Sequence, residues 1–358
     1  MVEWKVRQYQ EGDETQIVGL YNLDLKLESE RRGEETARRQ YTLDDWLWAF
    51  KNNPYGFLAI VGEHEGRIVG LMSAICMDMK IGDRTIRASQ ASGLFVHPDY
   101  RRQGMFLAIG RTMFEIAEKK GIQFSIGFPN EPAYRGHIQY GWFEASMVPV
   151  MTTYFDISKS VKARGIPLSS IVSKLINYNY ARKRKHKIPQ EDLEIKRVSR
   201  FDERVNGLWN RVLNNHGMMT VRDSKYLNWR YFGNPNSTYE VFIAENNGQI
   251  EGYLVTDKLQ NESVNVGWVI DVLCISKNVF LNLVHYAVGH LQKYSVDSIK
   301  CLMNNNKSEY KWIQKTGFTS YPRPKLRMIA RINSEEVADS FRVYSKDWYV
   351  TYGDCDFM

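Results

Sequence analysis

The sequence predicts an α/β protein with a mixed sheet of the α+β kind. Two similar folds are expected to follow one another along the chain. Two observations support this prediction: residues 1–155 alternate between strand-like and helix-like apolar patterns, and residues 191–333 repeat parts of that region at a nearly constant spacing. A basic linker, 156–190, separates the two regions, and a tail of residues 334–358 follows the second. The chain has 358 residues, enough for two domains of ordinary size.

The apolar pattern of the first region predicts its elements in order. Alternating apolar residues predict strands, and apolar residues three and four apart predict amphipathic helices. Glu65 and Gly66 are typical of a tight turn between strands, and Thr42 is typical of a helix start. The expected order is a strand at 4–9, helices at 11–27 and 43–50, strands at 57–61, 67–77 and 94–96, a helix from 105 to about 120, a strand at 123–128, a helix at 130–141 and a strand at 148–155.

The stretch from residue 91 to 121 carries the clearest chemical pattern. An apolar strand at 94–96 is stopped by Pro98, because proline has no N–H to donate to a neighbouring strand. Gly104 then precedes an amphipathic helix, and Arg101 and Arg102 stand just before it. The first turn of a helix has free N–H groups and the positive end of the helix dipole, so this turn suits a phosphate or diphosphate.

The string V-H-P-D-Y-R-R-Q-G-M resembles the acyl-CoA-binding turn of the GCN5-related N-acetyltransferases, whose pattern is Arg/Gln-x-x-Gly-x-Gly/Ala. Arg101 and Gly104 match this pattern, whereas Phe106 stands where the family has a small residue. The element order over residues 1–155 is also that of the family. The resemblance implies that acetyl-CoA contacts residues of the strand, the turn and the following helix: Leu94, Phe95, Val96, Arg101, Arg102, Gln103, Gly104, Met105, Phe106 and Asn130.

The predicted helix at 130–141 provides the second family feature. Asn130, with Ala133 and Gly141, stands at the spacing of the family string Asn-x-x-Ala-x-x-Leu-Tyr-x-Lys-x-Gly-Phe. The family tyrosine that often protonates the leaving CoA thiolate falls on His137, and Tyr134 and Tyr140 lie about one helical turn to either side. The candidate acids are therefore His137, Tyr134, Tyr140 and solvent.

Three blocks recur in the second region. Trp48 corresponds to Trp229, and the hairpin turn at Gly66 corresponds to one at Gly248, with offsets of 181 and 182 residues. The segment 306–317 has the same span as 130–141. The second copy has no Arg-x-x-Gly after its central strand, so it is expected to be degenerate, and one acyl-CoA site is expected in the first region.

Composition excludes several classes of protein. No apolar run is long enough to span a bilayer and no signal peptide is seen, which predicts a cytoplasmic protein without a transmembrane segment. The four cysteines have no metal-ligand spacing, so neither a metal site nor a disulfide framework is expected. The basic linker has nine Lys or Arg against one acid, a formal charge of +8, whereas the whole chain carries +7. The linker is either a solvated connector or a surface for an anionic membrane, RNA or an acidic substrate, and no DNA partner is expected.

The tail combines aromatic and acidic residues. Trp348 and Tyr349 provide apolar surface, so the tail is expected to fold back and pack. Having two such domains, the chain resembles the enhanced-intracellular-survival acetyltransferases, in which the chain end contributes to catalysis, although it is too short for their third domain. Asp354 and Asp356 are therefore candidate catalytic carboxylates.

These resemblances imply an N-acetyltransferase that uses acetyl-CoA and a primary amine of a small molecule or peptide. The base would be a water molecule or a tail acid, and the N–H of Phe95 or Val96 would polarise the thioester carbonyl. Two alternatives remain open. One is a transferase that depends on aminoacyl-tRNA, like the Fem-type enzymes, which also pair two such folds. The other is a non-catalytic CoA-binding module, which Phe106 and the absent tyrosine favour. The amine acceptor and the oligomeric state are left open.

Overall fold

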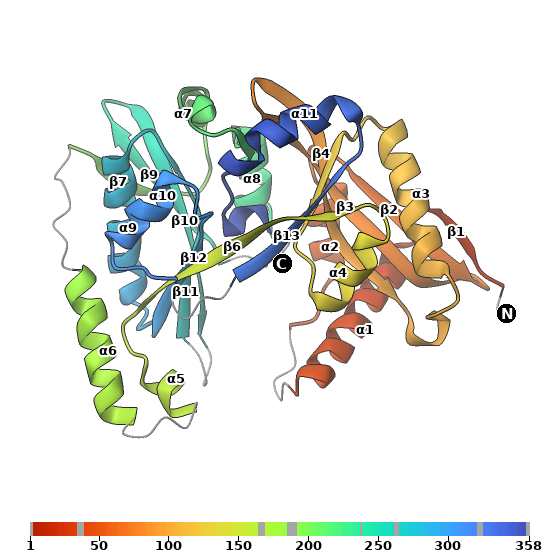
Figure 1. The fold of residues 1–358 in the computed structure, drawn as a ribbon, viewed down its shortest axis with the longest axis horizontal. Helices are drawn as coiled ribbons and strands as arrows, with labels where there is room; N and C mark the ends of the chain where they lie inside the picture. Colours follow the sequence, from red (N-terminus) through yellow and green to blue (C-terminus); the bar gives the residue numbers. More distant parts are fainter. Residues whose placement is uncertain are drawn as a thin grey trace.

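The computed structural model describes residues 3–33, 39–163, 169–184, 192–236, 238–260, 265–320 and 325–355. Twelve of its strands form one long twisted sheet in the order β1-β2-β3-β4-β5-β13-β6-β12-β11-β10-β9-β7, and β8 pairs with β3 off this path (Figure 1). The strands are β1 (Lys5–Gln8), β2 (Phe57–His64), β3 (Arg67–Ile81), β4 (Arg84–Val96), β5 (Phe124–Gly127), β6 (Phe143–Tyr154), β7 (Glu194–Val198), β8 (Met218–Thr220), β9 (Glu240–Asn246), β10 (Gln249–Gln260), β11 (Asn265–Cys274), β12 (Ser298–Leu302) and β13 (Lys325–Ile332).

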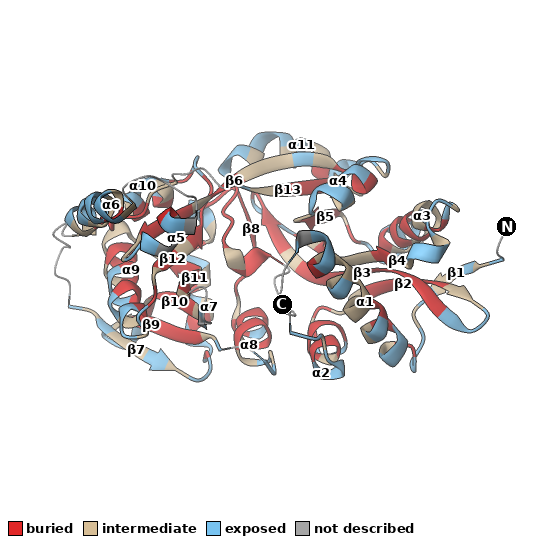
Figure 2. Cartoon of the chain, turned by 90° about the horizontal axis from the view of Figure 1, so that it is seen from below, coloured by how far each residue is buried: buried red, intermediate tan, exposed pale blue. Residues whose placement is uncertain are grey.

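Helices lie on both sides of this sheet, and most of the strands between them are buried, whereas the end strands β1 and β7 are partly exposed (Figure 2). Three predicted helices have clearly different bounds. The helix predicted at 11–27 runs from Glu14 to Arg32, the helix predicted at 43–50 is a short α2 followed by a π-helical turn at 47–51, and the helix predicted at 130–141 ends at Ile138. The helices are α1 (Glu14–Arg32), α2 (Leu43–Trp46), α3 (Met105–Lys119), α4 (Glu131–Ile138), α5 (Ser158–Ala163), α6 (Ser169–Arg184), α7 (Arg204–Val212), α8 (Ser224–Phe232), α9 (Lys277–Gln292), α10 (Ser308–Gln314) and α11 (Glu335–Tyr344), with a 3₁₀ turn η5 (Tyr352–Asp354) near the chain end.

The same order of elements occurs twice. In each half, three consecutive strands pair antiparallel. The third of them then pairs in parallel with the next strand, β4 with β5 in the first half and β11 with β12 in the second. Because parallel and antiparallel pairs share one sheet with helices between them, the predicted mixed α/β fold is confirmed. The hairpin turns at Gly66 and Gly248 both have a positive φ, +76° and +80°, which a glycine adopts without strain.

A reciprocal pair of tryptophans joins the two halves. The indole N–H of Trp48 donates to the carbonyl of Trp229, and the indole N–H of Trp229 donates to the carbonyl of Trp48, both at 2.8 Å. The two rings are stacked with centroids 5.7 Å apart. The corresponding residues of the repeat therefore meet each other at the contact between the halves.

The halves also exchange their closing strands, which is not apparent from the sequence. The sequence predicts residues 148–155 as the last strand of the first fold. In the structure, β13 from the second half lies between β5 and β6, pairing Ile329 with Gly127 and Met328 with Ser146. The later part of β6 instead pairs with β12, from Val150 to Tyr154. Each half thus obtains a central strand from the other, and the boundary at residue 155 divides the sequence but not the sheet.

The long helices of the two halves pack on their sheets at equivalent glycines. A Cβ at Gly70 would lie 2.7 Å from the sulfur of Met105 on α3, and a Cβ at Gly252 would lie 2.9 Å from Leu283 on α9. Only a residue without a side chain permits this approach. In the first half, this packing fixes the start of α3 over the end of β4.

Candidate functional site

A cleft of about 590 Å³ opens where α1, β4, α3 and α4 meet. Its lining contains most of the residues that the sequence assigned to acyl-CoA. The lining residues are Asp24, Arg31, Leu94, Phe95, Val96, Tyr100, Arg101, Arg102, Gly104, Phe106, Leu107, Asn130, Pro132 and Ala133. Eight of the ten proposed cofactor residues thus lie together on one hollow surface.

The floor of the cleft is the unpaired end of β4. The parallel pairing of β4 with β5 runs from Ala88 to Gln90 and then stops, whereas β4 continues to Val96. A bulge follows at Ser92 and Gly93, where two residues of β4 face one residue of β3. A bulge adds local twist, so the strand turns away from β5. The main-chain groups of residues 94–96 on the β5 side therefore face the cleft instead of a neighbouring strand.

The turn before α3 forms an anion site at one end of the cleft. Gly104 is the N-cap of the helix, with φ of +86°, and no side chain caps the free N–H groups of the first turn. A Cβ at Gly104 would meet no atom within 4 Å, so the space beside these N–H groups is open. Arg102, also with positive φ, is exposed beside it. The helix dipole and this guanidinium together favour a diphosphate, so the residues present fit the phosphate end of a CoA.

Arg101 has a different place from Arg102. Its Nε–H donates to the carbonyl of Val96 at 2.9 Å, and its guanidinium lies over the ring of Phe95 at 5.2 Å. These contacts hold the end of β4 against the turn. Arg101 therefore contributes charge to the cleft while it also fixes the shape of the cleft.

Phe106, which replaces the small residue of the family pattern, is accommodated by Gly136 on α4. A Cβ at Gly136 would lie 2.3 Å from the Phe106 ring. The ring also packs on Tyr140 at 5.4 Å, and the Tyr140 hydroxyl donates to the Phe106 carbonyl. The large side chain thus joins α3 to α4 and becomes part of the cleft wall.

Two proposed cofactor residues do not reach the cleft lining. Met105 is buried under the helix, against Gly62 and Gly70. The side-chain amide of Gln103 donates to the carbonyl of Asp99 at 3.0 Å, within the turn itself. The side chains of both residues therefore support the turn from behind.

The structure does not bring the proposed acids of α4 and of the turn after it into the cleft. His137 is only 4% exposed and packs on Trp142 at 4.8 Å. Burial lowers the pKa of His137 to about 4, so its imidazole is neutral at neutral pH. Burial also raises the pKa of Tyr140 above its usual range, and its hydroxyl is held by the Phe106 carbonyl. Tyr134 lies under the guanidinium of Arg327 at 4.0 Å. None of these three side chains is among the lining residues.

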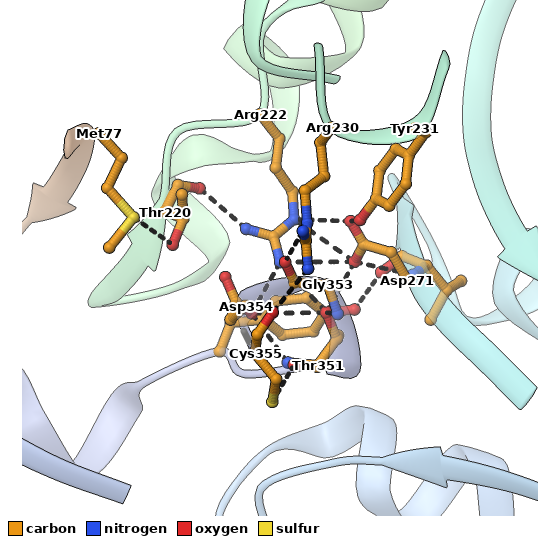
Figure 3. Close-up of polar contacts among 12 residues, drawn as sticks. Met77, Thr220, Arg222, Arg230, Tyr231, Asp271, Thr351, Gly353, Asp354 and Cys355 are labelled. Carbon is orange, nitrogen blue, oxygen red and sulfur yellow. Dashed lines mark hydrogen bonds and ion pairs between the residues drawn. The ribbon is translucent and has the colours of Figure 1, made fainter. Parts of the chain in front are cut away.

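Asp354 takes part in a buried ion-pair network in the second half (Figure 3). Arg222 donates to Asp354 at 2.8 Å and to Asp271 at 3.1 Å, and all three side chains are buried. Thr351 completes the network, because its backbone N–H donates to the Asp354 carboxylate at 2.9 Å. This arrangement explains why the tail packs inward, and it places Asp354 away from the cleft lining. Asp356 lies outside the described residues.

The position in the second half that corresponds to the cleft is closed. The helix α9 begins at Ser276, whose side chain accepts from the N–H of Val279 and so uses part of the anion site. The tail lies along β11, where the Tyr349 hydroxyl donates to the Val272 carbonyl and Thr351 donates to Asp271 at 2.9 Å. The open turn of the first half thus has no equivalent here among the described residues.

Two lining residues on α1 were not anticipated from the sequence. Asp24 and Arg31 are seven residues apart, so they lie on the same face of the helix, and that face borders the cleft. Burial, and next the nearby Glu28, raise the pKa of Asp24 to about 6. The seven-residue spacing was visible in the sequence, but nothing in it showed that this face would cover β4.

No metal-binding group of three or more His, Cys, Asp or Glu occurs in the ranges that the structure describes. Nor does any helix in those ranges have the length and apolar character needed to cross a membrane.

Residues 5–143 match the family model described as an acetyltransferase (GNAT) domain. No curated protein sequence matches the chain. Among solved structures, a GCN5-related N-acetyltransferase from Anabaena variabilis ATCC 29413 has 11% identity and a TM-score of 0.64, covering 93% of this chain and 73% of that chain. A protein of unknown function from Enterococcus faecalis V583, titled a probable N-acyltransferase, has 16% identity and a TM-score of 0.64, covering 95% and 74%.

The N-myristoyltransferase of Saccharomyces cerevisiae with bound myristoyl-CoA has 12% identity and a TM-score of 0.60, covering 93% of this chain and 83% of that chain. At these identities the solved structures establish a shared fold that extends over nearly the whole chain, beyond the part that the family model matches. The family match and the cleft lie in the same region. Residues 5–143 therefore match a GNAT acetyltransferase domain, whose strands share one sheet with β13 of the second half within a larger mixed α/β fold.

Proposed function

We propose that the protein transfers an acyl group from an acyl-CoA, with acetyl-CoA as the first choice, to a primary amine of a small molecule or peptide. The observation that carries this proposal is the cleft at the end of β4, inside the GNAT acetyltransferase domain. A yeast structure of the same fold is titled with bound myristoyl-CoA, which supports a CoA ligand and leaves the length of the acyl group open.

The described residues divide the binding of acyl-CoA between two regions. The free N–H groups of the first turn of α3, with Arg102 beside them, would hold the diphosphate. The main chain of residues 94–96, which β5 does not pair, would hold the amide groups of the pantetheine arm. The bound acyl-CoA supplies an activated thioester carbonyl to the amine.

Asp24 is the residue that we assign to proton removal. Among the described residues that line the cleft, it has the sole carboxylate. As the amine nitrogen bonds to the carbonyl carbon and the C–S bond breaks, one proton passes from nitrogen to Asp24, and the released thiolate takes a proton from solvent. With its pKa raised to about 6, Asp24 is largely ionised at neutral pH and is a better base than an ordinary aspartate. A water molecule or Asp356 remains the alternative base.

The test is a panel of primary amines with acetyl-CoA, followed by release of free thiol. We expect one acyl-CoA site per chain by calorimetry and turnover of at least one amine. Asp24→Asn should reduce kcat by about 100-fold with the acyl-CoA dissociation constant changed less than about threefold. Glu30→Gln is the matched control, because Glu30 is on the same helix and its side chain is 58% exposed. Equal turnover by the parent and Asp24→Asn would contradict the assignment of the base.

A second candidate function, a CoA-binding module without catalysis, is favoured by one observation. The position of the family tyrosine is occupied by His137, which is buried and outside the cleft lining. Such a module would bind acetyl-CoA with the same stoichiometry but release no thiol with any amine. Binding of acetyl-CoA without thiol release across a broad panel of amines would therefore favour this function over the enzyme.

A further inference from the structure

The helix α6, within the basic linker, has one face that is well packed and another that is not. On the packed face, the hydroxyls of Tyr180 and Thr319 are 2.8 Å apart, and the ring of Tyr180 lies 5.3 Å from that of Tyr154 on β6. Arg184 donates from Nη1 to the hydroxyl of Thr153 at 3.1 Å. These contacts fix the helix and its rotation about its own axis.

The opposite face presents a row of apolar side chains. Ile171, Leu175 and Tyr178 are 54%, 61% and 67% exposed, although each is a large hydrophobic residue. Since consecutive helical residues advance by about 100°, positions 171, 175 and 178 form one stripe, roughly half a turn away from Tyr180. The helix stands at the outer edge of the molecule, and much of it is exposed (Figures 1 and 2). We call these three residues the α6 stripe.

Cations lie close to the α6 stripe. Lys174 and Arg182 are exposed beside it on the same helix, and Lys162 is exposed on the neighbouring α5. Lys183 is also exposed, and its ammonium lies over the ring of Tyr180 at 5.8 Å. The basic linker as a whole contains nine Lys or Arg and one acid, and α6 contains no acid. One face of the protein therefore combines exposed apolar side chains with a concentrated positive charge, a combination that a solvated connector does not need.

We propose that α6 docks the protein on the surface of an anionic lipid bilayer. The α6 stripe would enter the boundary between headgroups and acyl chains, while the long side chains of the flanking Lys and Arg reach the lipid phosphates. Each basic residue near such a surface adds attraction that falls off within a Debye length.

Other partners fit this face less well. RNA would use the cations and could stack on Tyr178, but it would leave Ile171 and Leu175 in water. A second copy of the chain that met through the same face would bring two groups of like charges together. An anionic bilayer satisfies both the apolar stripe and the charge.

The test is co-sedimentation of the full-length protein with vesicles. We expect binding to phosphatidylcholine vesicles that contain about a third phosphatidylglycerol, at least tenfold weaker binding to pure phosphatidylcholine, and loss of binding as salt is raised. Changing the α6 stripe to serine (Ile171→Ser, Leu175→Ser, Tyr178→Ser) should weaken binding at least tenfold. The control is Leu259→Ser with Val343→Ser, which removes apolar residues that are 51% and 68% exposed elsewhere.

A second variant separates charge from apolar contact. Lys174→Ser, Arg182→Ser and Lys183→Ser should weaken binding and reduce its dependence on salt. Thermal melting and acyl-CoA affinity of each variant verify that the fold is intact, because these side chains lie outside the cleft. The proposal is overturned if the stripe variant binds vesicles like the parent, if neutral and anionic vesicles bind equally, or if the α6 stripe instead supports RNA binding or dimerisation without vesicle binding.

Discussion

Neutralising Asp354 should destabilise the protein without changing its chemistry. The carboxylate is 4% exposed and accepts from Arg222 at 2.8 Å and from the N–H of Thr351 at 2.9 Å. In Asp354→Asn the amide oxygen can keep both hydrogen bonds, so the loss is mainly that of the charge. Arg222 is buried and keeps Asp271 as a partner, which limits the damage.

The size of the expected loss of stability follows from the cost of removing one charge of a buried ion pair. Such a change costs about 3–5 kcal/mol, and the remaining ion pair with Asp271 places this case near the lower end. A loss of about 3 kcal/mol in the free energy of unfolding corresponds to a fall in Tm of roughly 4 °C for a chain of this size. The matched control is Asp339→Asn, since the pair of Asp339 with Arg342 has the same 2.8 Å separation, but Asp339 is 89% exposed. It should change stability by less than about 0.5 kcal/mol.

The assay combines thermal unfolding with kinetics well below the melting temperature. We expect the Asp354→Asn variant to melt earlier and still to bind acetyl-CoA and turn over its best amine within about twofold of the parent. A variant that melts like the parent but loses turnover more than about tenfold would refute this reasoning and indicate that Asp354 takes part in catalysis.

Three further predictions concern the first half. Gly104→Ala should weaken acetyl-CoA binding at least about tenfold because its methyl group enters the open space beside the helix start, whereas Gly121→Ala, also at positive φ, should cost stability alone; calorimetry and melting separate the two. Stability should fall as pH drops from about 6.5 to about 4, because His137 binds a proton in the unfolded chain over this range but stays neutral in the folded protein, where its pKa is lowered to about 4. His137→Gln should reduce the dependence of Tm on pH, and an unchanged dependence would contradict this prediction. Gly136→Ala should displace the Phe106 ring and lower acetyl-CoA affinity, and Phe106→Ala should relieve most of that loss in a double-mutant cycle; additive effects would show that the two do not touch.

The local parts of the site were predictable from the sequence. The anion site depends on Gly104 and its neighbours, which are adjacent in the chain, so their spacing alone indicates a phosphate-binding helix start. The hairpin turns and the repeated tryptophans were predictable for the same reason, since each block is short and recurs. The meeting of Trp48 with Trp229 was not, because a repeat does not show how its copies face each other.

The remaining features depend on contacts between distant residues. The exchange of β6 and β13 is decided by pairing between segments almost 200 residues apart, and each strand looks from its own sequence like the last strand of its half. The inward position of Asp354 depends on Arg222, 132 residues earlier. Asp24 was missed because the sequence identifies one face of α1 as polar but does not show that it borders β4.

The residues beside two equivalent bulges show how the halves differ in structure at the corresponding place. Both β4 and β11 carry one at the equivalent place, at Ser92 and Gly93 in the first and at Ile270 in the second. In β4 the bulge turns the strand end toward the cleft. In β11 it adjoins Asp271, a fully buried carboxylate that requires compensation and receives it from Arg222, two tyrosine hydroxyls and the tail. A ligand could enter there only by breaking that network, so the same backbone feature opens a site in one half and anchors the chain end in the other.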